Sequence, residues 1–188
     1  MSLVATRTAH DDGITLVELI VGVVVAGLFV GMLAVIFANG LRAQEEATAR
    51  DHATGSADLA SATLQESVRN AATFRVSDSG TRLDAAVATS GSTLTWECRA
   101  WKVSGGALYV STGSTARPAD IVSGRKPVVR GVATTLTGGA AFVQATGTVE
   151  QQRRVRIGMT VTNGAQTVTL SDAVTAQMFV QGGAPACW

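Results

Sequence analysis

The chain contains 188 residues, a length that suits one globular domain or one domain with an added segment. Charged residues make up only 15%, below the roughly 25% that is usual for soluble domains. With 46% hydrophobic residues, the composition excludes a wholly disordered chain. The 15 basic and 14 acidic residues nearly cancel, which excludes the strong overall positive field of many nucleic-acid-binding proteins.

An uncharged apolar segment runs from Leu19 to Ala38. As a helix it would extend about 30 Å, the thickness of the hydrocarbon core of a bilayer. Backbone groups in lipid must bond within their own segment, so a helix is predicted despite the many valines. No second segment is long enough to span a bilayer, which excludes a multi-span membrane protein. Gly27 and Gly31 have the spacing that lets two membrane helices approach closely.

Two simpler interpretations of this segment fit less well. A secretory signal peptide has a shorter apolar core, and the best cleavage site after this one, Ile36-Phe37-Ala38, matches the small-x-small pattern poorly. A plain membrane anchor explains the length but gives no role to Glu18, which directly precedes the apolar run. A carboxylate near lipid is costly unless it is paired or lies at the interface.

The junction from Asp12 to Ile20 favours a third interpretation, because Gly13 is followed five residues later by Glu18 and then by the apolar run. This pattern resembles the cleavage and methylation motif of type IV prepilins and type II secretion pseudopilins. The resemblance implies that a prepilin peptidase cuts after Gly13, removes the leader 1–13 and methylates the new N-terminus at Ile14. It also implies an assembly role for Glu18, whose carboxylate neutralises the N-terminal amine of a neighbouring subunit.

The same resemblance implies a fold and a function. Residues 14–38 would form the helix of the membrane or filament core, 39–75 its amphipathic continuation, and 76–188 a β-rich head. The chain would be a minor pilin or pseudopilin of the J- or W-type that first crosses the membrane once and then joins a cell-surface or extracellular filament. Its partners would be membrane lipid, other pilin or pseudopilin subunits, the prepilin peptidase, and the pilus assembly platform with its ATPase. The alternative is a single-pass, membrane-anchored extracytoplasmic binding domain that does not polymerise.

A helical stripe continues beyond the apolar run. Its apolar members recur at steps of three and four residues: Ala57, Ala60, Leu64, Val68, Ala71 and Phe74. We therefore expect one helix from Ile14 to about Phe74, with two helices broken near Gly55 as the alternative.

After a turn at Asp78-Ser79-Gly80 the period changes to two, which predicts strands. A Gly105-Gly106 turn would place Val103 opposite Leu108 and Trp101 opposite Val110. Trp96 and Trp101 are an odd number of residues apart, so both can face one core only if a bulge lies near Ala100.

A second hairpin is predicted around Asn163-Gly164, a pair that favours a type I′ turn. That turn would set Met159 opposite Val168 and Ile157 opposite Leu170. Residues 112–127 have the composition of a surface loop, and 128–135, 141–148 and 173–180 are weaker strand candidates. A helix followed by strands indicates an α+β fold with an antiparallel sheet.

The two cysteines, Cys98 and Cys187, fit the exported head that the resemblance implies, since disulfides persist in oxidising compartments. We expect a disulfide between them, with two unpaired thiols as the alternative.

No catalytic site, metal site or cofactor is predicted, and the chain is interpreted as a non-enzyme. His10 and His52 have no partner pattern, and neither a nucleophile elbow nor a phosphate-binding loop is present. Six basic residues concentrate in the C-terminal half: Arg125, Lys126, Arg130, Arg153, Arg154 and Arg156. No aromatic residues are interleaved with them, so a solvated strand face is preferred over a nucleic-acid site.

Overall fold

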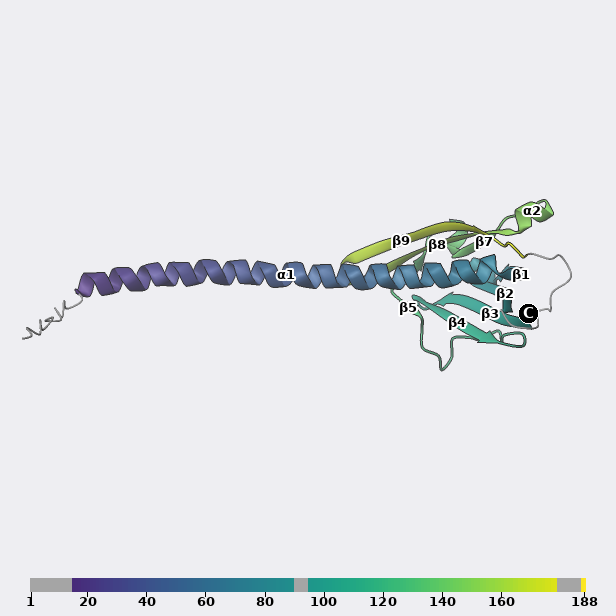
Figure 1. Cartoon of the computed structure of the whole chain (residues 1–188), viewed down its shortest axis with the longest axis horizontal. Coiled ribbons are helices and arrows are strands. Elements are labelled where there is room, and N and C mark those ends of the chain that lie inside the picture. Colours follow the sequence, from purple (N-terminus) through teal and green to yellow (C-terminus); the bar gives the residue numbers. More distant parts are fainter. Residues whose placement is uncertain (1–14, 90–94, 179–186) are drawn as a thin grey trace, which may run out of the picture. The chain divides into compact units, whose positions relative to one another are not determined.

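The computed structural model describes residues 15–89, 95–178 and 187–188 of the chain. It consists of a long helix followed by antiparallel strands, which confirms the predicted α+β class (Figure 1). The contacts divide the chain into two compact units, residues 1–45 and 46–188. The first unit holds the N-terminal part of the helix, and the second holds the rest of the helix and all the strands.

Helix α1 spans Leu16–Arg69 without a break at Gly55, so the single helix was predicted correctly. It ends five residues earlier than expected, because Ala71 and Phe74 belong to strand β1, Ala71–Ser77. Their spacing fits a helical stripe, but Thr73, Phe74 and Val76 favour a strand, and pairing with the next strand decides between the two. Phe74 is buried in the strand, as it would also be in a longer helix. The apolar pattern by itself therefore does not distinguish a helix from a strand here.

Five strands form the first sheet, in the order β1-β2-β3-β4-β5. After β1 come a short 3₁₀ turn η1 (Asp78–Gly80), then β2 (Arg82–Thr89), β3 (Thr95–Ser104), β4 (Ala107–Gly113) and β5 (Val129–Arg130). The predicted turn at residues 78–80 is confirmed, and the Gly105-Gly106 hairpin has the predicted register of Val103 with Leu108.

Both faces of this first sheet are covered, which removes the need for a bulge near Ala100. The register of β3 with its two neighbours is continuous, so Trp96 and Trp101 lie on opposite faces. Trp101 is buried in the main core with α1, whereas Trp96 is half-buried on the other side. The six residues Arg82–Val87 of β2 are all buried, so the strand shows no polar alternation.

The second sheet is built around one long strand. Its strands are β6 (Val132–Thr134), β7 (Phe142–Gln144), β8 (Arg154–Asn163) and β9 (Gln166–Thr175), with the short elements η2 (Thr137–Gly139) and α2 (Val149–Gln152) between them. Strand β8 pairs with β9 along one edge and with β6 and β7 along the other. The weaker strand candidates thus supply β5, β6 and β7. Residues 173–175 end β9, and no separate strand begins among the described residues that follow.

The predicted register of the second hairpin was wrong by two residues. Met159 lies opposite Leu170, and the closing pair is Asn163 with Gln166. The two turn residues are therefore Gly164 and Ala165, and of these only Gly164 has a positive φ, +57°. A turn whose first central residue alone is left-handed favours glycine at that place, and this preference outweighs the Asn-Gly signal.

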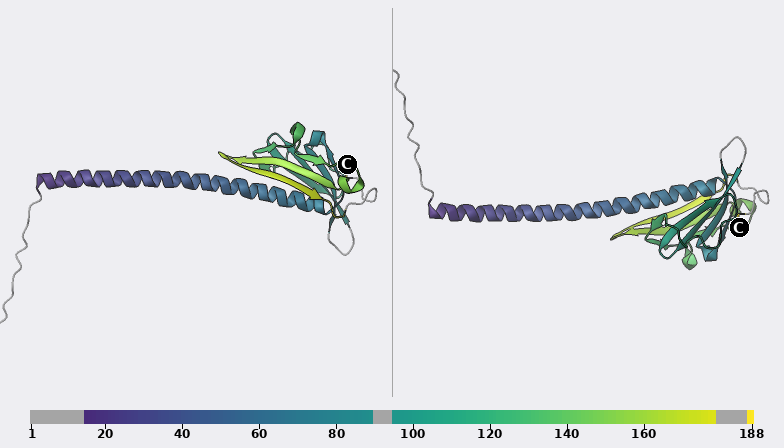
Figure 2. Two further views of the ribbon diagram at one scale, coloured as in Figure 1. Left: turned by 90° about the horizontal axis from the view of Figure 1, so that it is seen from above. Right: turned by 90° about the horizontal axis from the view of Figure 1, so that it is seen from below.

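The two sheets enclose the C-terminal part of α1 in one core (Figures 1 and 2). The helix contributes a buried stripe that includes Ala57, Ala60, Leu64 and Val68. Gly131 joins β5 of the first sheet to β6 of the second with a φ of +72°, and a Cβ atom there would lie 2.1 Å from the Thr162 carbonyl oxygen. Only glycine fits where the chain passes from one sheet to the other.

Candidate functional site

The first candidate site is the N-terminal part of α1. Its large apolar side chains are exposed, from 75% at Leu16 to 47% at Leu41. The helix is long and apolar enough to cross a membrane, and none of its most apolar stretch is buried. An exposed apolar surface of this size is typical of a segment that contacts a membrane or another protein. Gly13 and Ile14, the predicted cleavage and methylation residues, lie outside the described part of the chain.

Glu18 has a local partner that the sequence interpretation missed. The Thr15 hydroxyl accepts a hydrogen bond from the Glu18 N–H at 3.3 Å, and the Thr15 carbonyl accepts one from Leu19 at 3.1 Å. Thr15 is therefore the N-cap of α1, and Glu18 occupies the third helical position, the Ser/Thr-x-x-Glu spacing of a capping box. A carboxylate in the first turn is also stabilised by the helix dipole. The observed bond uses the backbone N–H of Glu18 and does not depend on its side chain, so any assembly role of the carboxylate is a separate question.

Gly27 and Gly31 lie on the exposed part of α1. A Cβ atom added at either position would meet no described atom within 4 Å. The two glycines thus leave open backbone on the helix surface, as the close approach of another helix requires.

The second candidate site is the disulfide at the end of the chain. Cys98 and Cys187 are bonded, as predicted, with 5.3 Å between their Cα atoms. Both are buried and pack with Ala86 in a small cluster apart from the main core. The next residue, Trp188, lies under the guanidinium of Arg75, whose Cζ atom is 5.2 Å from the ring centroid. The last two residues are therefore fastened to the first sheet by a covalent bond and a cation–π contact.

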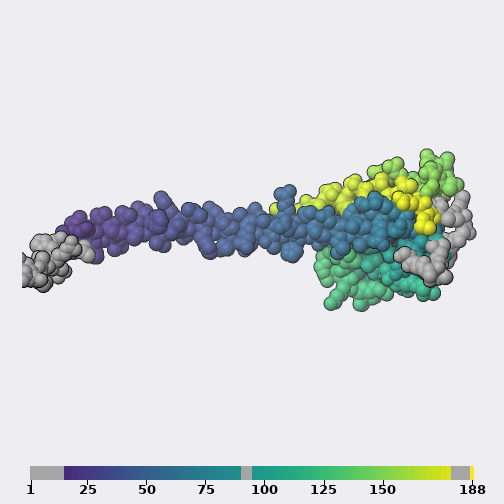
Figure 3. Space-filling model, in the orientation of Figure 1, coloured from purple at the N-terminus to yellow at the C-terminus, as the bar shows by residue number. Residues whose placement is uncertain are grey.

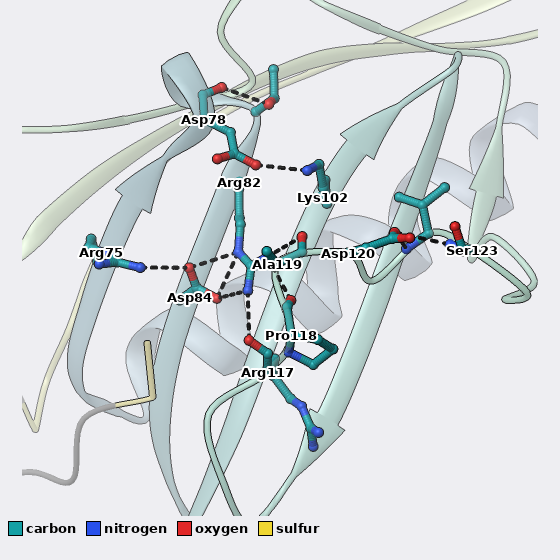
Figure 4. A network of polar contacts seen from close by, with 12 residues as sticks. Arg75, Asp78, Arg82, Asp84, Lys102, Arg117, Pro118, Ala119, Asp120 and Ser123 are labelled. Atoms are coloured by element: carbon teal, nitrogen blue, oxygen red, sulfur yellow. Dashed lines mark hydrogen bonds and ion pairs between the residues drawn. The ribbon is translucent and has the colours of Figure 1, made fainter.

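A buried ion pair lies on the same side of the first sheet, which faces away from α1. Arg82 Nη2 lies 2.7 Å from Asp84 Oδ1, and the side chains are 6% and 0% exposed. Arg82 Nε also donates to the carboxylate, and this bonding to Asp84 raises the pKa of Arg82 (Figure 4). No pattern in the sequence indicated that these two charged residues are buried, so the pair was not predicted.

The rest of the Arg82 guanidinium fastens the loop after β4. It donates to the carbonyl oxygens of Pro118 and Ala119 at 2.9 and 2.7 Å, and to that of Arg117 at 3.3 Å (Figure 4). Ile121 of the same loop is fully buried. The predicted surface loop 112–127 is thus fixed over the sheet by buried contacts.

Two surface carboxylates, Asp120 of this loop and Asp78 of η1, also accept hydrogen bonds. A hydrogen bond from Ser123, with backbone N–H donors at Val122 and Ser123, lowers the pKa of Asp120 to about 2. Lys102 Nζ donates to Asp78 at 2.8 Å, and this bond lowers the pKa of Asp78.

The six basic residues do not form a single binding surface. Arg153 donates to the Ala176 carbonyl and pairs with Glu150, so it fastens the end of β9. Arg130 belongs to the first sheet, whereas Arg154 and Arg156 are exposed on the second. Arg125 and Lys126 are exposed in the loop before β5.

The remaining features of the described residues concern metal ligands and a hollow in the second unit. Among them, no three His, Cys, Asp or Glu side chains lie close enough together to hold a metal ion. A hollow of about 380 Å³ beside β7 is lined by Val76, Phe142, Val143 and other uncharged residues, none of which titrates near neutral pH. Comparison with family models, with curated proteins and with solved structures found no match for this chain.

Proposed function

We propose that the chain is a minor type IV pilin or pseudopilin, a structural subunit that assembles into or primes an extracytoplasmic filament. The observation that carries the proposal is the spacing of Gly13 and Glu18 at the start of a long helix whose apolar side chains are exposed. Cleavage after Gly13 would remove the polar leader and keep this helix in the product. Membrane lipid would cover the helix before assembly, and the helices of other subunits would cover it in the filament at the cell surface.

In this proposal the amine created on Ile14 provides a cationic partner for the Glu18 of an incoming subunit. Each charge is costly by itself in an apolar helix bundle, and the two together form a pair in a medium of low dielectric constant. The open backbone at Gly27 and Gly31 would allow neighbouring helices to approach closely. The prepilin peptidase, the assembly platform and its ATPase would act on the chain before and during assembly, and the chain itself would have a structural and not a catalytic role.

Three substitutions at Glu18 separate a role of its charge in assembly from a role of its side chain at the helix N-terminus. Glu18→Gln keeps a side chain that can complete the capping box but removes the charge. Glu18→Asp keeps the charge, and Glu18→Ala removes both the charge and the polar group. Each variant is expressed in the native cells, and its amounts in the membrane and in the sheared filament fraction are measured.

The proposal expects Glu18→Gln and Glu18→Ala to reach the membrane, because removing a charge makes the segment more apolar. Both should be depleted from the filament fraction, whereas Glu18→Asp should be retained in part. If Glu18→Gln enters filaments as well as the wild type, the charge of Glu18 has no role in assembly. If the wild type itself never leaves the membrane fraction, the chain is a membrane-anchored domain that does not polymerise.

Variants at Gly13 test the maturation step. Gly13→Ala should still be processed, whereas Gly13→Trp should accumulate with its leader, since a prepilin peptidase requires a small residue before the cut. Normal processing of Gly13→Trp would contradict the assignment.

A further inference from the structure

Strand β9 is a long outer edge of the second sheet. Its ladder with β8 is continuous over ten residue pairs, from Arg154–Thr175 to Asn163–Gln166. In Figure 3, β9 (yellow) borders the C-terminal part of α1 (blue). One edge of β9 is therefore paired with β8. Whether the other edge has unpaired N–H and C=O groups depends on the direction in which these groups point.

Those directions follow from hydrogen bonds on the far side of β8. Gly158 and Thr162 donate their N–H groups toward the β6–β7 side of β8, each at 2.9 Å. Directly opposed residues of an antiparallel ladder point their backbone groups either both inward or both outward. The residues opposite these two, Ser171 and Thr167, therefore point away from β8, and so does Thr169 between them. Within the described part of the chain, none of these three residues has a hydrogen bond to its outward N–H or C=O group.

Edge strands of this length are normally protected against pairing. Natural proteins use proline, lysine, inward charges or bulges for this purpose. Strand β9 contains no proline and no lysine, and its register has no bulge. Its one inward charge, Asp172, is already bonded by Gln65 and by the Ala173 N–H. Its exposed side chains are small or β-branched, namely Thr167, Thr169, Ser171, Ala173 and Thr175. Such a row fits closely against an added strand.

A groove lies beside this edge. It has a volume of about 200 Å³ and is formed by Ala57, Asp58 and Ser61 of α1 together with Val168–Asp172 of β9. The small side chains of Ala57 and Ser61 leave room for side chains of an added strand. The groove also contains two carboxylates, those of Asp58 and Asp172.

The two carboxylates differ in how well they are satisfied. Asp172 accepts hydrogen bonds from Gln65 and from the Ala173 N–H. Asp58 is exposed and makes neither a hydrogen bond nor an ion pair with any residue that the structure describes. A ligand in this groove would therefore gain most from a basic side chain placed near Asp58.

We propose that β9 binds an extended, basic segment of a partner protein as an added strand. The outward backbone groups of Thr167, Thr169 and Ser171 supply the hydrogen bonds, and alternate side chains of the segment enter the groove toward Asp58. A second copy of β9 is the wrong partner, because antiparallel pairing would bring Asp58 and Asp172 of both copies to one seam. The proposal concerns the head of the protein and holds whether or not the chain forms a filament.

The test uses the full-length protein in detergent micelles at low salt. The probe is a peptide of six Lys-Thr repeats with blocked ends, and the control peptide has Glu in place of each Lys. Amide hydrogen exchange is followed residue by residue by NMR. The Lys-Thr peptide should slow exchange at Thr167, Thr169 and Ser171 but not at Val168 and Leu170, whose N–H groups already bond to β8.

Three variants sharpen the test. Thr169→Pro removes one outward donor without touching the ladder to β8, and it should abolish the protection, whereas Thr169→Val keeps the donor and should behave as the wild type. Asp58→Asn on the exposed face of α1 should weaken peptide binding about two- to fivefold, as expected for an exposed ion pair. Thermal unfolding of each variant checks that it is folded. If Thr169→Pro does not fold, Asp58→Asn still tests the proposal.

Several results would overturn the proposal. These are equal binding of the Glu-Thr peptide, protection without alternation along β9, and absence of protection at millimolar Lys-Thr peptide. Protection of the same three amides in concentrated protein without peptide would show self-association in place of a basic partner.

Discussion

The substitution Asp84→Asn tests the buried ion pair of the first sheet. Asparagine has nearly the shape of aspartate but carries no charge, so the Arg82 guanidinium would remain buried without its counter-ion. The Asp84 side chain is completely buried, and Arg82 is bonded to it through both Nε and Nη2.

Removing one partner of a buried pair costs about 3–5 kcal/mol. In a domain of this size, 1 kcal/mol corresponds to roughly 3–4 °C in melting temperature, so Asp84→Asn should lower it by roughly 10–20 °C. The loop held by Arg82 should also become accessible to trypsin.

Thermal unfolding of the full-length protein in detergent, with limited trypsin digestion, measures both effects. Glu97→Gln is the control, because it breaks a pair with Arg99 in which the side chains are 29% and 21% exposed. It should cost less than about 1 kcal/mol. The double variant Arg82→Met with Asp84→Leu should recover part of the lost stability, since no buried charge is left unpaired; Arg75, which lies 3.8 Å from Asp84, has a side chain that is 47% exposed and stays solvated. A loss below about 1 kcal/mol for Asp84→Asn would refute this account of the sheet.

Three further predictions concern other contacts of the head. Gly131→Ala should lower the melting temperature measurably by circular dichroism, because the new Cβ would collide with a carbonyl oxygen at a positive φ; an unchanged value would contradict the described passage between the sheets. Peptide mapping of the exported protein without reductant should recover Cys98 joined to Cys187, and mutating both to Ala should cost up to about 4–5 kcal/mol, since the bond closes a loop of 89 residues; free alkylation of both thiols would refute the bond. The lowered pKa of Asp78 means that its bond to Lys102 contributes stability above the ordinary carboxyl range, and this contribution is lost as the pH falls through the folded-state pKa. Asp78→Asn should therefore flatten the acid side of the stability–pH curve, and an unaltered curve would show that the bond is unimportant.

Local patterns predicted the helix and the first hairpin well. The helix follows from a long run without proline, and the Gly105-Gly106 pair fixes the register of β3 with β4. The second hairpin contains two overlapping turn signals, because Gly164 can be either the second or the first central residue. Side-chain parity is the same in both registers, so the apolar pattern does not choose between them.

Strand β1 was assigned to the helix because Ala71 and Phe74 continue its apolar stripe, and β2 was not identified for a different reason. Strand β2 is buried on both faces, by α1 on one side and by the loop after β4 and the chain end on the other. A strand covered on both sides loses the alternation by which single-sequence reasoning finds strands. The same covering loop accounts for the unexpected burial of Arg82 and Asp84, because only the folded chain brings the carbonyl groups of residues 117–119 to the guanidinium.

The candidate sites also differ in whether a local sequence pattern indicates them. The roles of Gly13, Ile14 and Glu18 are predictions from a short local pattern, whereas the disulfide, predicted from composition and the expected compartment, is present. The groove between α1 and β9 joins residues more than a hundred positions apart, such as Asp58 and Asp172, and no local pattern indicates it.

The mature N-terminus tests the proposed function most directly. Intact-mass measurement and N-terminal sequencing are carried out on the protein isolated from its native membranes and from sheared filaments. A chain that starts at Ile14 with a methylated amine is the predicted result, since cleavage after Gly13 and methylation together define a processed pilin-like subunit. A chain that starts at Met1 or Ser2 would contradict the proposal and indicate a membrane anchor that keeps its leader.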